Sequence, residues 1–159
     1  PRLIIADEPT TALDVTIQAQ ILELMQSLSK DLGTALIIIT HNLGVVARYA
    51  ARVAVMYAGK IIETADSLSL YGEPRHPYTL GLLNSVPRLD EEMGTKLEPI
   101  EGLPPDLIDM PDRCSFAPRC RYAIEKCTTE APTLGEVGHA HESSCWRASE
   151  LSEIGVKVG

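Results

Sequence analysis

Hydrophobic and polar positions alternate in blocks along the first sixty residues. Aliphatic runs at residues 2–6 (RLIIA) and 34–40 (TALIIIT) have the length and β-branched content of buried strands. Between them, residues 14–33 carry apolar side chains at helical spacing, which predicts an amphipathic helix. Its expected apolar stripe consists of Ile17, Ile21, Met25, Leu28 and Leu32. The pattern therefore predicts a strand, a helix and a second strand, in that order.

The residues at the ends of this helix are suited to terminating it. Asp14 is a favourable N-cap, and Gly33 can adopt the left-handed conformation that follows many helices. A short helix is expected over residues 43–49. Further on, two strand-like runs, RVAVMY and KIIET, are separated by Ala58 and Gly59, which predicts a β-hairpin.

The predicted order of elements places polar side chains at one edge of a sheet. A strand, a crossover helix and another strand form a right-handed unit with parallel strands in almost all cases. Asp7 and Glu8 follow the first strand, and Thr40 and His41 follow the second. We therefore expect both pairs at the same carboxyl edge, where open α/β sheets bind their ligands.

The amino-acid composition of the sequence changes after Glu63. Nine of the eleven prolines fall between Pro74 and Pro132, and long aliphatic runs disappear. Within this part we expect a short helix over residues 78–85 and a proline-rich, acidic connector over residues 87–113. We predict a division into residues 1–72 and an appended region of residues 73–159.

Composition and charge narrow the class of protein. The 159 residues are 45% hydrophobic and 23% charged, which is typical of a folded domain and not of a disordered chain. A net charge of −8 argues against non-specific nucleic-acid binding. The sequence has no apolar run of the roughly 20 residues needed to cross a bilayer. A core-type strand begins almost at Pro1, without a signal peptide, so we expect an amino-terminally truncated chain with an exposed sheet edge.

Two adjacent carboxylates after an apolar strand indicate phosphate chemistry. Phosphoryl transfer to water requires a divalent cation and a group that orients or deprotonates the water, and Asp7 and Glu8 can supply these two functions. Considered without their sequence context, Asp14 is interpreted as a helix cap and His41 as a solvated loop residue.

The string DEPTTALD, residues 7–14, followed about thirty residues later by TH at residues 40–41, resembles the second half of an ATP-binding cassette (ABC) ATPase. The resemblance implies that Asp7 binds Mg²⁺, that Glu8 is the catalytic base, that Asp14 lies in the D-loop contacting the opposite subunit, and that His41 senses the γ-phosphate of ATP. It also implies a fold class: α/β, the C-terminal part of a P-loop ABC ATPase domain, followed by a small irregular tail that contains the cysteines.

Three motifs of that family are missing from the sequence. It has no G-x-x-x-x-G-K-[ST] loop, no LSGGQ-like signature and no glutamine loop. Without the phosphate-cradling lysine and backbone amides, ATP affinity should largely vanish. We expect no ATPase activity from these residues by themselves.

A second segment makes the resemblance more specific. By itself HPYT, residues 76–79, indicates a turn that opens a helix, with His76 solvated. Followed by the connector and cysteines, it resembles the ATPase subunits of oligopeptide and dipeptide importers. The resemblance implies a peripheral protein at the cytoplasmic face of the membrane, bound to transmembrane permease subunits and to a second, identical or different, ATPase subunit. The cargo stays open among oligopeptides, dipeptides, nickel and related substrates.

All four cysteines lie in the tail, with the spacing C-x5-C-x6-C-x17-C, and are Cys114, Cys120, Cys127 and Cys145. Disulfides are the least favoured interpretation for an ATP-dependent protein of the reducing cytosol. Zinc sites favour closer cysteine pairs, although His139 and His141 are available as substitute ligands. The tail is similar to the cluster-bearing tail of peptide-importer ATPases, which implies a 4Fe-4S cluster, with Zn²⁺ as the alternative and unligated thiols less favoured.

Arg113, Arg119 and Arg121 flank the cysteines and are available to stabilise thiolates, although each by itself reads as a surface arginine. Stapling a tail that has little core is the expected role of a bound metal or cluster. Two other functions compete with peptide import. One is an ABC-type ATPase acting on DNA, and the other is a stand-alone metal-binding interaction module. The acidic charge and the HPYT-to-cysteine tail argue against the first.

Overall fold

The computed structural model describes residues 1–85, 99–108 and 110–151. They fall into two compact units, Pro1–Ala50 and Ala51–Gly159. The predicted division after residue 72 is a functional one and stays a prediction. Much of the predicted connector, residues 86–98 and 109, and the C-terminal residues 152–159 lie outside the described residues.

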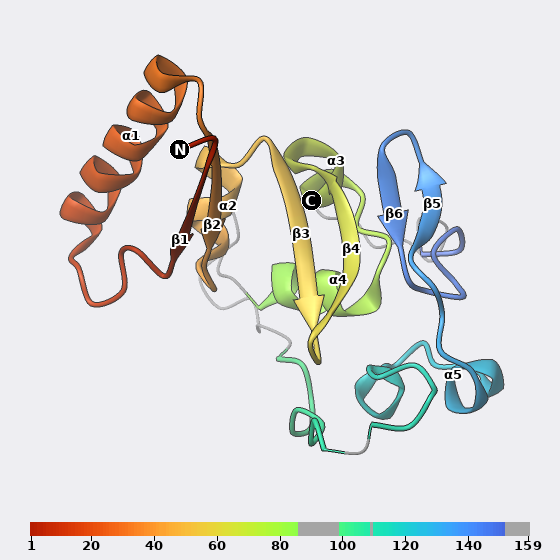
Figure 1. The fold of residues 1–159 in the computed structure, drawn as a ribbon. Helices are drawn as coiled ribbons and strands as arrows, with labels where there is room; N and C mark the ends of the chain where they lie inside the picture. Colours follow the sequence, from red (N-terminus) through yellow and green to blue (C-terminus); the bar gives the residue numbers. More distant parts are fainter. Residues whose placement is uncertain (86–98, 109, 152–159) are drawn as a thin grey trace, which may run out of the picture. The chain divides into compact units, whose positions relative to one another are not determined.

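The first unit contains the predicted strand, helix and strand (Figure 1). β1 (Leu3–Asp7) and β2 (Ala35–Ile39) are parallel, and their register runs from Leu3 opposite Ala35 to Asp7 opposite Ile39. α1 (Val15–Leu32) connects them, and α2 (Leu43–Tyr49) follows β2. The predicted order of elements and the parallel pairing are confirmed.

The ends of the helices in this unit depend on specific side chains. The Asp14 carboxylate accepts hydrogen bonds from the backbone N–H groups of Thr16 and Ile17, each at 3.0 Å, and so caps α1. Gly33 ends α1 with φ 60°, the left-handed conformation that favours glycine. Asn42 caps α2 in the same way as Asp14 caps α1. The two predicted ends of α1 are confirmed.

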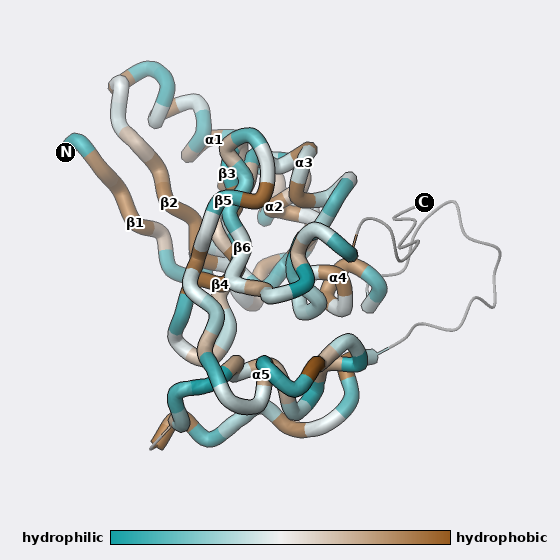
Figure 2. The backbone as a smooth tube through the Cα atoms, turned by 90° about the vertical axis from the view of Figure 1, so that its right-hand side faces the viewer, coloured by the Kyte–Doolittle hydropathy of each residue, from teal (hydrophilic) through white to brown (hydrophobic). Residues whose placement is uncertain are grey.

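The apolar side chains of this unit are less buried than predicted. Figure 2 shows the hydrophobic stretches of β1 and β2, yet Leu3 is 46% exposed and Ile5 is 61% exposed. The buried face of α1 is centred on Leu22, at 1% exposure, whereas Leu28 and Leu32 of the predicted stripe are exposed. Two strands offer too little surface to cover a full apolar helix face, so the expectation of buried strands and of that stripe was wrong for this unit.

The second unit contains a four-stranded antiparallel sheet in the order β3-β4-β6-β5. β3 (Arg52–Tyr57) and β4 (Lys60–Asp66) form the predicted hairpin, in which Ala58 and Gly59 have φ 49° and 75°. Two positive φ values in a two-residue loop match the twist of the flanking strands. β5 (Gly135–Gly138) and β6 (His141–Ser143) extend this sheet from the tail and were not predicted.

Short helices complete the second unit: α3 (Ser67–Gly72), α4 (Pro77–Asn84), the 3-10 turn η1 (Ala117–Arg119) and α5 (Glu125–Thr129). α4 lies within one residue of the predicted helix. Its Tyr78 ring packs against Tyr57 of the hairpin, at 4.6 Å between centroids, and against Phe116 of the cysteine segment, at 5.5 Å. Tyr57, Phe116 and Ile62 form the buried core of this unit.

A buried polar contact joins the hairpin to the tail. Glu63 is fully buried on β4, and one of its carboxylate oxygens lies 2.7 Å from Nε2 of His141 on β6. The same oxygen accepts a hydrogen bond from the backbone N–H of Arg75. This contact fixes β6, and with it the segment leading to Cys145, against β4.

Among the described residues, no helix has both the length and the apolar character required to cross a membrane.

Candidate functional site

The carboxyl edge of the parallel strands places Glu8 beside His41. The backbone N–H of Glu8 donates to the carbonyl of Ile39 at 2.9 Å, which extends the β1-β2 ladder by one step. Glu8 then turns with φ 45°, an uncommon conformation for a residue with a side chain. His41 Nδ1 lies 3.0 Å from Glu8 Oε1. The predicted meeting of an acid and the imidazole at one edge is therefore observed.

Thr11 is a second partner of Glu8 that the sequence analysis missed. Its hydroxyl donates to the other carboxylate oxygen of Glu8 at 2.9 Å. The hydrogen bonds from His41 and Thr11 lower the pKa of Glu8, because they favour the charged carboxylate. A threonine three residues after the acid was the available signal in the sequence.

The other two predicted residues of this edge occupy different positions. Asp7 is the last residue of β1 and is exposed opposite Ile39, next to Glu8 in the chain. Asp14 is committed to capping α1, so any contact with an opposite subunit would be in addition to the cap. Between them, the buried Thr10 accepts a hydrogen bond from Gln18 of α1 at 2.8 Å, which ties the loop to the helix.

This edge has the chemistry of a cation and phosphate site. Two neighbouring exposed carboxylates attract a divalent cation, and an imidazole beside them can contact phosphate oxygens. The Glu8 and His41 side chains are 47% and 79% exposed, so a ligand can reach both of them.

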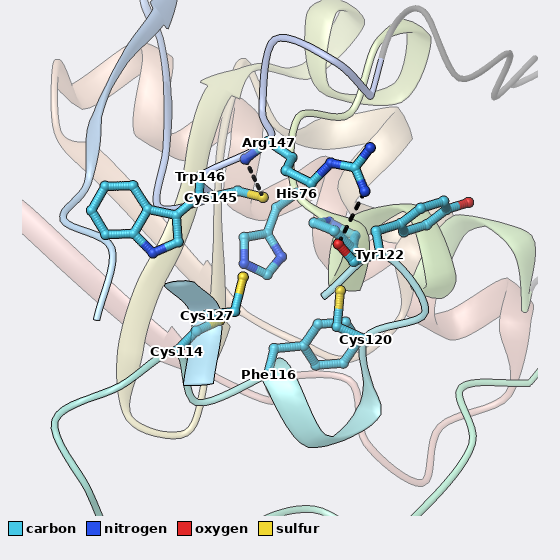
Figure 3. Close-up of a pocket in the computed structure, with 10 residues that line it drawn as sticks. His76, Cys114, Phe116, Cys120, Tyr122, Cys127, Cys145, Trp146 and Arg147 are labelled. Carbon is cyan, nitrogen blue, oxygen red and sulfur yellow. Dashed lines mark hydrogen bonds between the residues drawn. The ribbon is translucent and has the colours of Figure 1, made fainter. Parts of the chain in front are cut away.

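The second candidate site is a cavity in the tail that all four cysteines line (Figure 3). Cys114 and Cys120 flank the segment that contains Phe116, Cys127 lies on α5, and Cys145 follows β6. The backbone N–H of Cys114 donates to the carbonyl of Cys127 at 3.2 Å, which joins two of these segments. The remaining lining residues are His76, Pro77, Tyr122, Trp146 and Arg147.

The four thiols are free and lie close enough to influence one another. Burial raises the pKa of Cys114, raises that of Cys120 to about 11 and raises that of Cys145 to about 12, and the neighbouring cysteines add to each shift. At Cys114, Cys120 and Cys145, which are half-buried, the protonated thiol is favoured over the thiolate unless a cation compensates the charge. The geometry thus favours either protonated thiols or thiolates bound to metal.

The two histidines considered as substitute zinc ligands do not line this cavity. His141 is paired with Glu63, and His139 is exposed. Within residues 1–85, 99–108 and 110–151, no group of three or more His, Cys, Asp or Glu side chains is arranged to hold a metal ion. The expectation that either histidine assists the cysteines is not supported by the structure.

The histidine at the cavity is instead His76, and the expectation that it is solvated was wrong. His76 is 2% exposed, and its Nδ1 accepts a hydrogen bond from the backbone N–H of Tyr78 at 3.0 Å, which caps α4. Burial lowers the pKa of His76 to about 4. Its position before Pro77 was the signal for the cap, but only the tertiary structure shows its neighbours.

The arginine at the cavity also differs from those singled out in the sequence. Arg147 lines it, and its backbone N–H lies 3.4 Å from Cys145 Sγ. Its side chain donates to the carbonyl of Tyr122 at 3.3 Å. Arg119, in contrast, donates to the backbone carbonyls of Glu101 and Ile100 and to the Tyr57 hydroxyl.

The chain has an α/β fold with acids and a histidine at the end of two parallel strands. This arrangement is consistent with the C-terminal part of an ABC-type ATP-binding protein. Residues 62–127 match the family described as oligopeptide/dipeptide transporter, C-terminal region. The matched residues include the second part of β4, the HPYT segment and three of the four cysteines.

Curated relatives agree with this match. The chain is 53% identical over 157 residues to a protein of Brucella ovis named as a peptide import ATP-binding protein, covering 96% of this chain and 46% of that protein. It is 52% identical to the oligopeptide transport ATP-binding protein OppD of Mycobacterium tuberculosis, over 92% of this chain and 24% of OppD. It is 49% identical to the dipeptide transport ATP-binding protein DppD of Bacillus subtilis, over 100% of this chain and 47% of DppD.

Over most of its length the chain is similar to parts of ATP-binding proteins of peptide, oligopeptide and dipeptide transport. It spans about half the length of the Brucella and Bacillus relatives that it matches.

Proposed function

We propose that the protein containing this chain is the ATP-hydrolysing, energy-coupling subunit of a peptide importer. The observation that carries the proposal is the contact between Glu8 and His41 at the carboxyl edge of β1 and β2. Relatives named for peptide, oligopeptide and dipeptide transport support the substrate class. The protein would act at the cytoplasmic face of the membrane, bound to permease subunits and to a second ATPase subunit.

Each residue of the edge has a separate task in this proposal. Asp7, at the end of β1, would hold Mg²⁺, which offsets the charge of the ATP phosphates when bound. Glu8 would orient the attacking water and accept its proton, while Thr11 and His41 hold the carboxylate in place. His41 would contact the γ-phosphate, and Asp14 would face the opposite subunit from the start of α1.

Residues 1–159 should not hydrolyse ATP by themselves. The sequence has neither the phosphate-binding loop nor the signature segment that would bind and enclose ATP. We expect no Mg²⁺-dependent phosphate release above the background of a Glu8→Gln variant of the same chain. Robust hydrolysis by the isolated chain, lost in that variant, would contradict the proposal.

Reconstitution tests the function of the complete protein. With its permease in lipid vesicles, we expect ATP hydrolysis to accompany peptide uptake and to be insensitive to DNA. The matched control replaces Glu23, an exposed acid on α1, by Gln and should leave both activities unchanged. Hydrolysis stimulated by DNA, without peptide uptake, would favour the rival ATPase function.

We further propose that Cys114, Cys120, Cys127 and Cys145 hold a 4Fe-4S cluster. Four free cysteines line one cavity, and together they offer the four thiolate ligands that such a cluster requires. A cluster spaces its thiolates more widely than one ion does, so the lack of a single-ion arrangement in the described residues is compatible with it. When bound, the cluster would supply folding free energy to a tail with a small core.

Anaerobic purification tests this cofactor. We expect brown protein with iron and sulfide in equal amounts, and loss of both in a Cys127→Ser variant. Colourless, iron-free protein that contains zinc would contradict the proposal and support the alternative metal.

A further inference from the structure

The cysteine cavity contains one buried polar group that neither proposal uses. His76 lies at the start of α4, is 2% exposed and lines the cavity together with the four cysteines (Figure 3). Buried polar groups in proteins almost always have a hydrogen-bond partner. The second nitrogen of this imidazole is therefore the group to consider as a partner for a ligand in the cavity.

The hydrogen bond at Nδ1 determines which ring nitrogen carries the proton. Nδ1 accepts from the backbone N–H of Tyr78 at 3.0 Å, so its lone pair is occupied and it carries no hydrogen. A neutral imidazole then has its proton on Nε2. Within residues 1–85, 99–108 and 110–151, the hydrogen bond of the ring is the one at Nδ1. Nε2 is not one of the fully enclosed atoms without a partner, which are Tyr49 Oη, Glu63 Oε2 and Thr79 Oγ1 in this part of the chain, so it stays accessible to a group in the cavity.

Several contacts fix the orientation of the ring. Pro77 occupies the first turn of α4, where its fixed φ suits a helix start. The next residue, Tyr78, is held between Tyr57 and Phe116 in the core. The Phe116 ring also packs against His76 itself, with centroids 5.9 Å apart. The His-Pro-Tyr segment thus positions one donor at the cysteine cavity.

We infer that His76 is a positioning residue that donates its Nε2–H to a sulfur atom of the cysteine-bound cluster. This inference rests on the proposed 4Fe-4S cofactor. Hydrogen bonds to cluster sulfurs stabilise the extra negative charge of the reduced state and raise the reduction potential. Through this hydrogen bond, His76 would raise the reduction potential of the cluster.

Two substitutions separate the cap from the donor. In His76→Asn, the amide oxygen can replace Nδ1 as the acceptor of the Tyr78 N–H, but the short side chain has no group at the position of Nε2. In His76→Gln, the longer side chain can place an N–H near that position. His139→Gln changes an exposed histidine of the same tail and is the matched control.

The experiment measures the midpoint potential of each variant of the complete protein, loaded anaerobically, in a redox titration followed by electron paramagnetic resonance. We expect a more negative potential for His76→Asn, and values close to the unaltered protein for His76→Gln and His139→Gln. A fully loaded His76→Asn variant with an unchanged potential would overturn the role of His76 and leave the cluster intact as a proposal. Unaltered protein that binds no iron would overturn the cofactor itself.

A second measurement covers the case in which His76→Asn does not fold or load. Nitrogen-15 NMR of the metal-free, unaltered protein reports the tautomer of His76. We expect the proton on Nε2. A proton on Nδ1 would overturn the inference, because the ring would then have no donor to direct at the cavity.

Discussion

At the scale of single residues, the backbone conformation and hydrogen bonds of Glu8 give the clearest indication of function. Its backbone has an uncommon positive φ of 45°, and two different groups hydrogen-bond its two carboxylate oxygens. Strained backbone held by several contacts is frequent at functional sites. A carboxylate fixed in this way is prepared to orient a water molecule.

Removing the Thr11 contact should weaken catalysis without weakening ATP binding. In the complete protein, Thr11→Val deletes one of the two hydrogen bonds that position the Glu8 carboxylate. A hydrogen bond contributes about 1 kcal/mol, so we expect kcat to fall by about fivefold. Steady-state kinetics checks this, with Thr11→Ser as the control that keeps the hydroxyl. An unchanged kcat in Thr11→Val would show that Thr11 does not position Glu8.

At the scale of elements, helix caps account for where the helices begin. Asp14, Asn42 and Asp66 cap α1, α2 and α3 with their side-chain oxygens, and His76 caps α4 with a ring nitrogen. Each cap satisfies backbone N–H groups that have no partner within the helix. Local sequence therefore determines these boundaries.

The Asp14 cap can be separated from any function of the D-loop. Asp14→Ala should lower the free energy of unfolding by about 1 kcal/mol, whereas Asp14→Asn, which also caps well, should be close to neutral. Urea unfolding followed by circular dichroism measures both. Equal losses in the two variants would mean that the carboxylate charge matters, and not the cap.

The cap of α3 makes a prediction about ionisation. Hydrogen bonds from the Ser69 hydroxyl and backbone N–H lower the pKa of Asp66 below its ordinary value. A lowered pKa stabilises the fold above the pKa of the unfolded chain, and this contribution is lost as the pH falls through the folded value. We expect Ser69→Ala to raise the Asp66 pKa in a carbon-13 NMR titration. A pKa that does not move would exclude the Ser69 hydroxyl as the cause.

The elements that could be predicted from sequence are those with local signals. β1, α1, β2 and the hairpin each have a periodic or turn pattern, and the parallel pairing followed from the strand-helix-strand order. β5 and β6 are only four and three residues long, and β6 pairs with Glu63 and Thr64, far away in the sequence. Such short, non-local pairing leaves no periodicity to recognise.

Predicting the sites had a similar limit. The meeting of Glu8 and His41 followed from topology, because both residues come directly after parallel strands. The burial of His76, the pairing of His141 with Glu63 and the position of Arg147 depend on contacts between distant segments. No local pattern distinguishes a buried histidine from a solvated one.

At the scale of the whole molecule, the two units are stabilised differently. The first unit leaves several large aliphatic side chains of β1 and β2 exposed. The second has a buried aromatic core, a buried Glu63-His141 contact across 78 residues of chain, and the cysteine cavity. The second unit therefore has the stronger long-range contacts.

The Glu63-His141 contact should be a major determinant of tail stability. His141→Leu leaves the fully buried Glu63 carboxylate without one of its hydrogen-bond partners. An unsatisfied buried polar group costs about 1–3 kcal/mol, and a charged one costs more, so we expect a loss of at least about 2 kcal/mol. Chemical denaturation of the complete protein measures it. The control His139→Leu, at an exposed position of the same tail, should be close to neutral.

The most direct test of the account is the hydrolysis of ATP by a Glu8→Gln variant of the complete protein, compared with its affinity for ATP. Loss of a general base lowers rates by about 10²–10⁴-fold, and Gln keeps the size of the side chain. We predict a decrease in kcat of at least about a hundredfold with ATP affinity retained. Turnover at the rate of the unaltered protein would contradict the assignment of this sheet edge as the catalytic site.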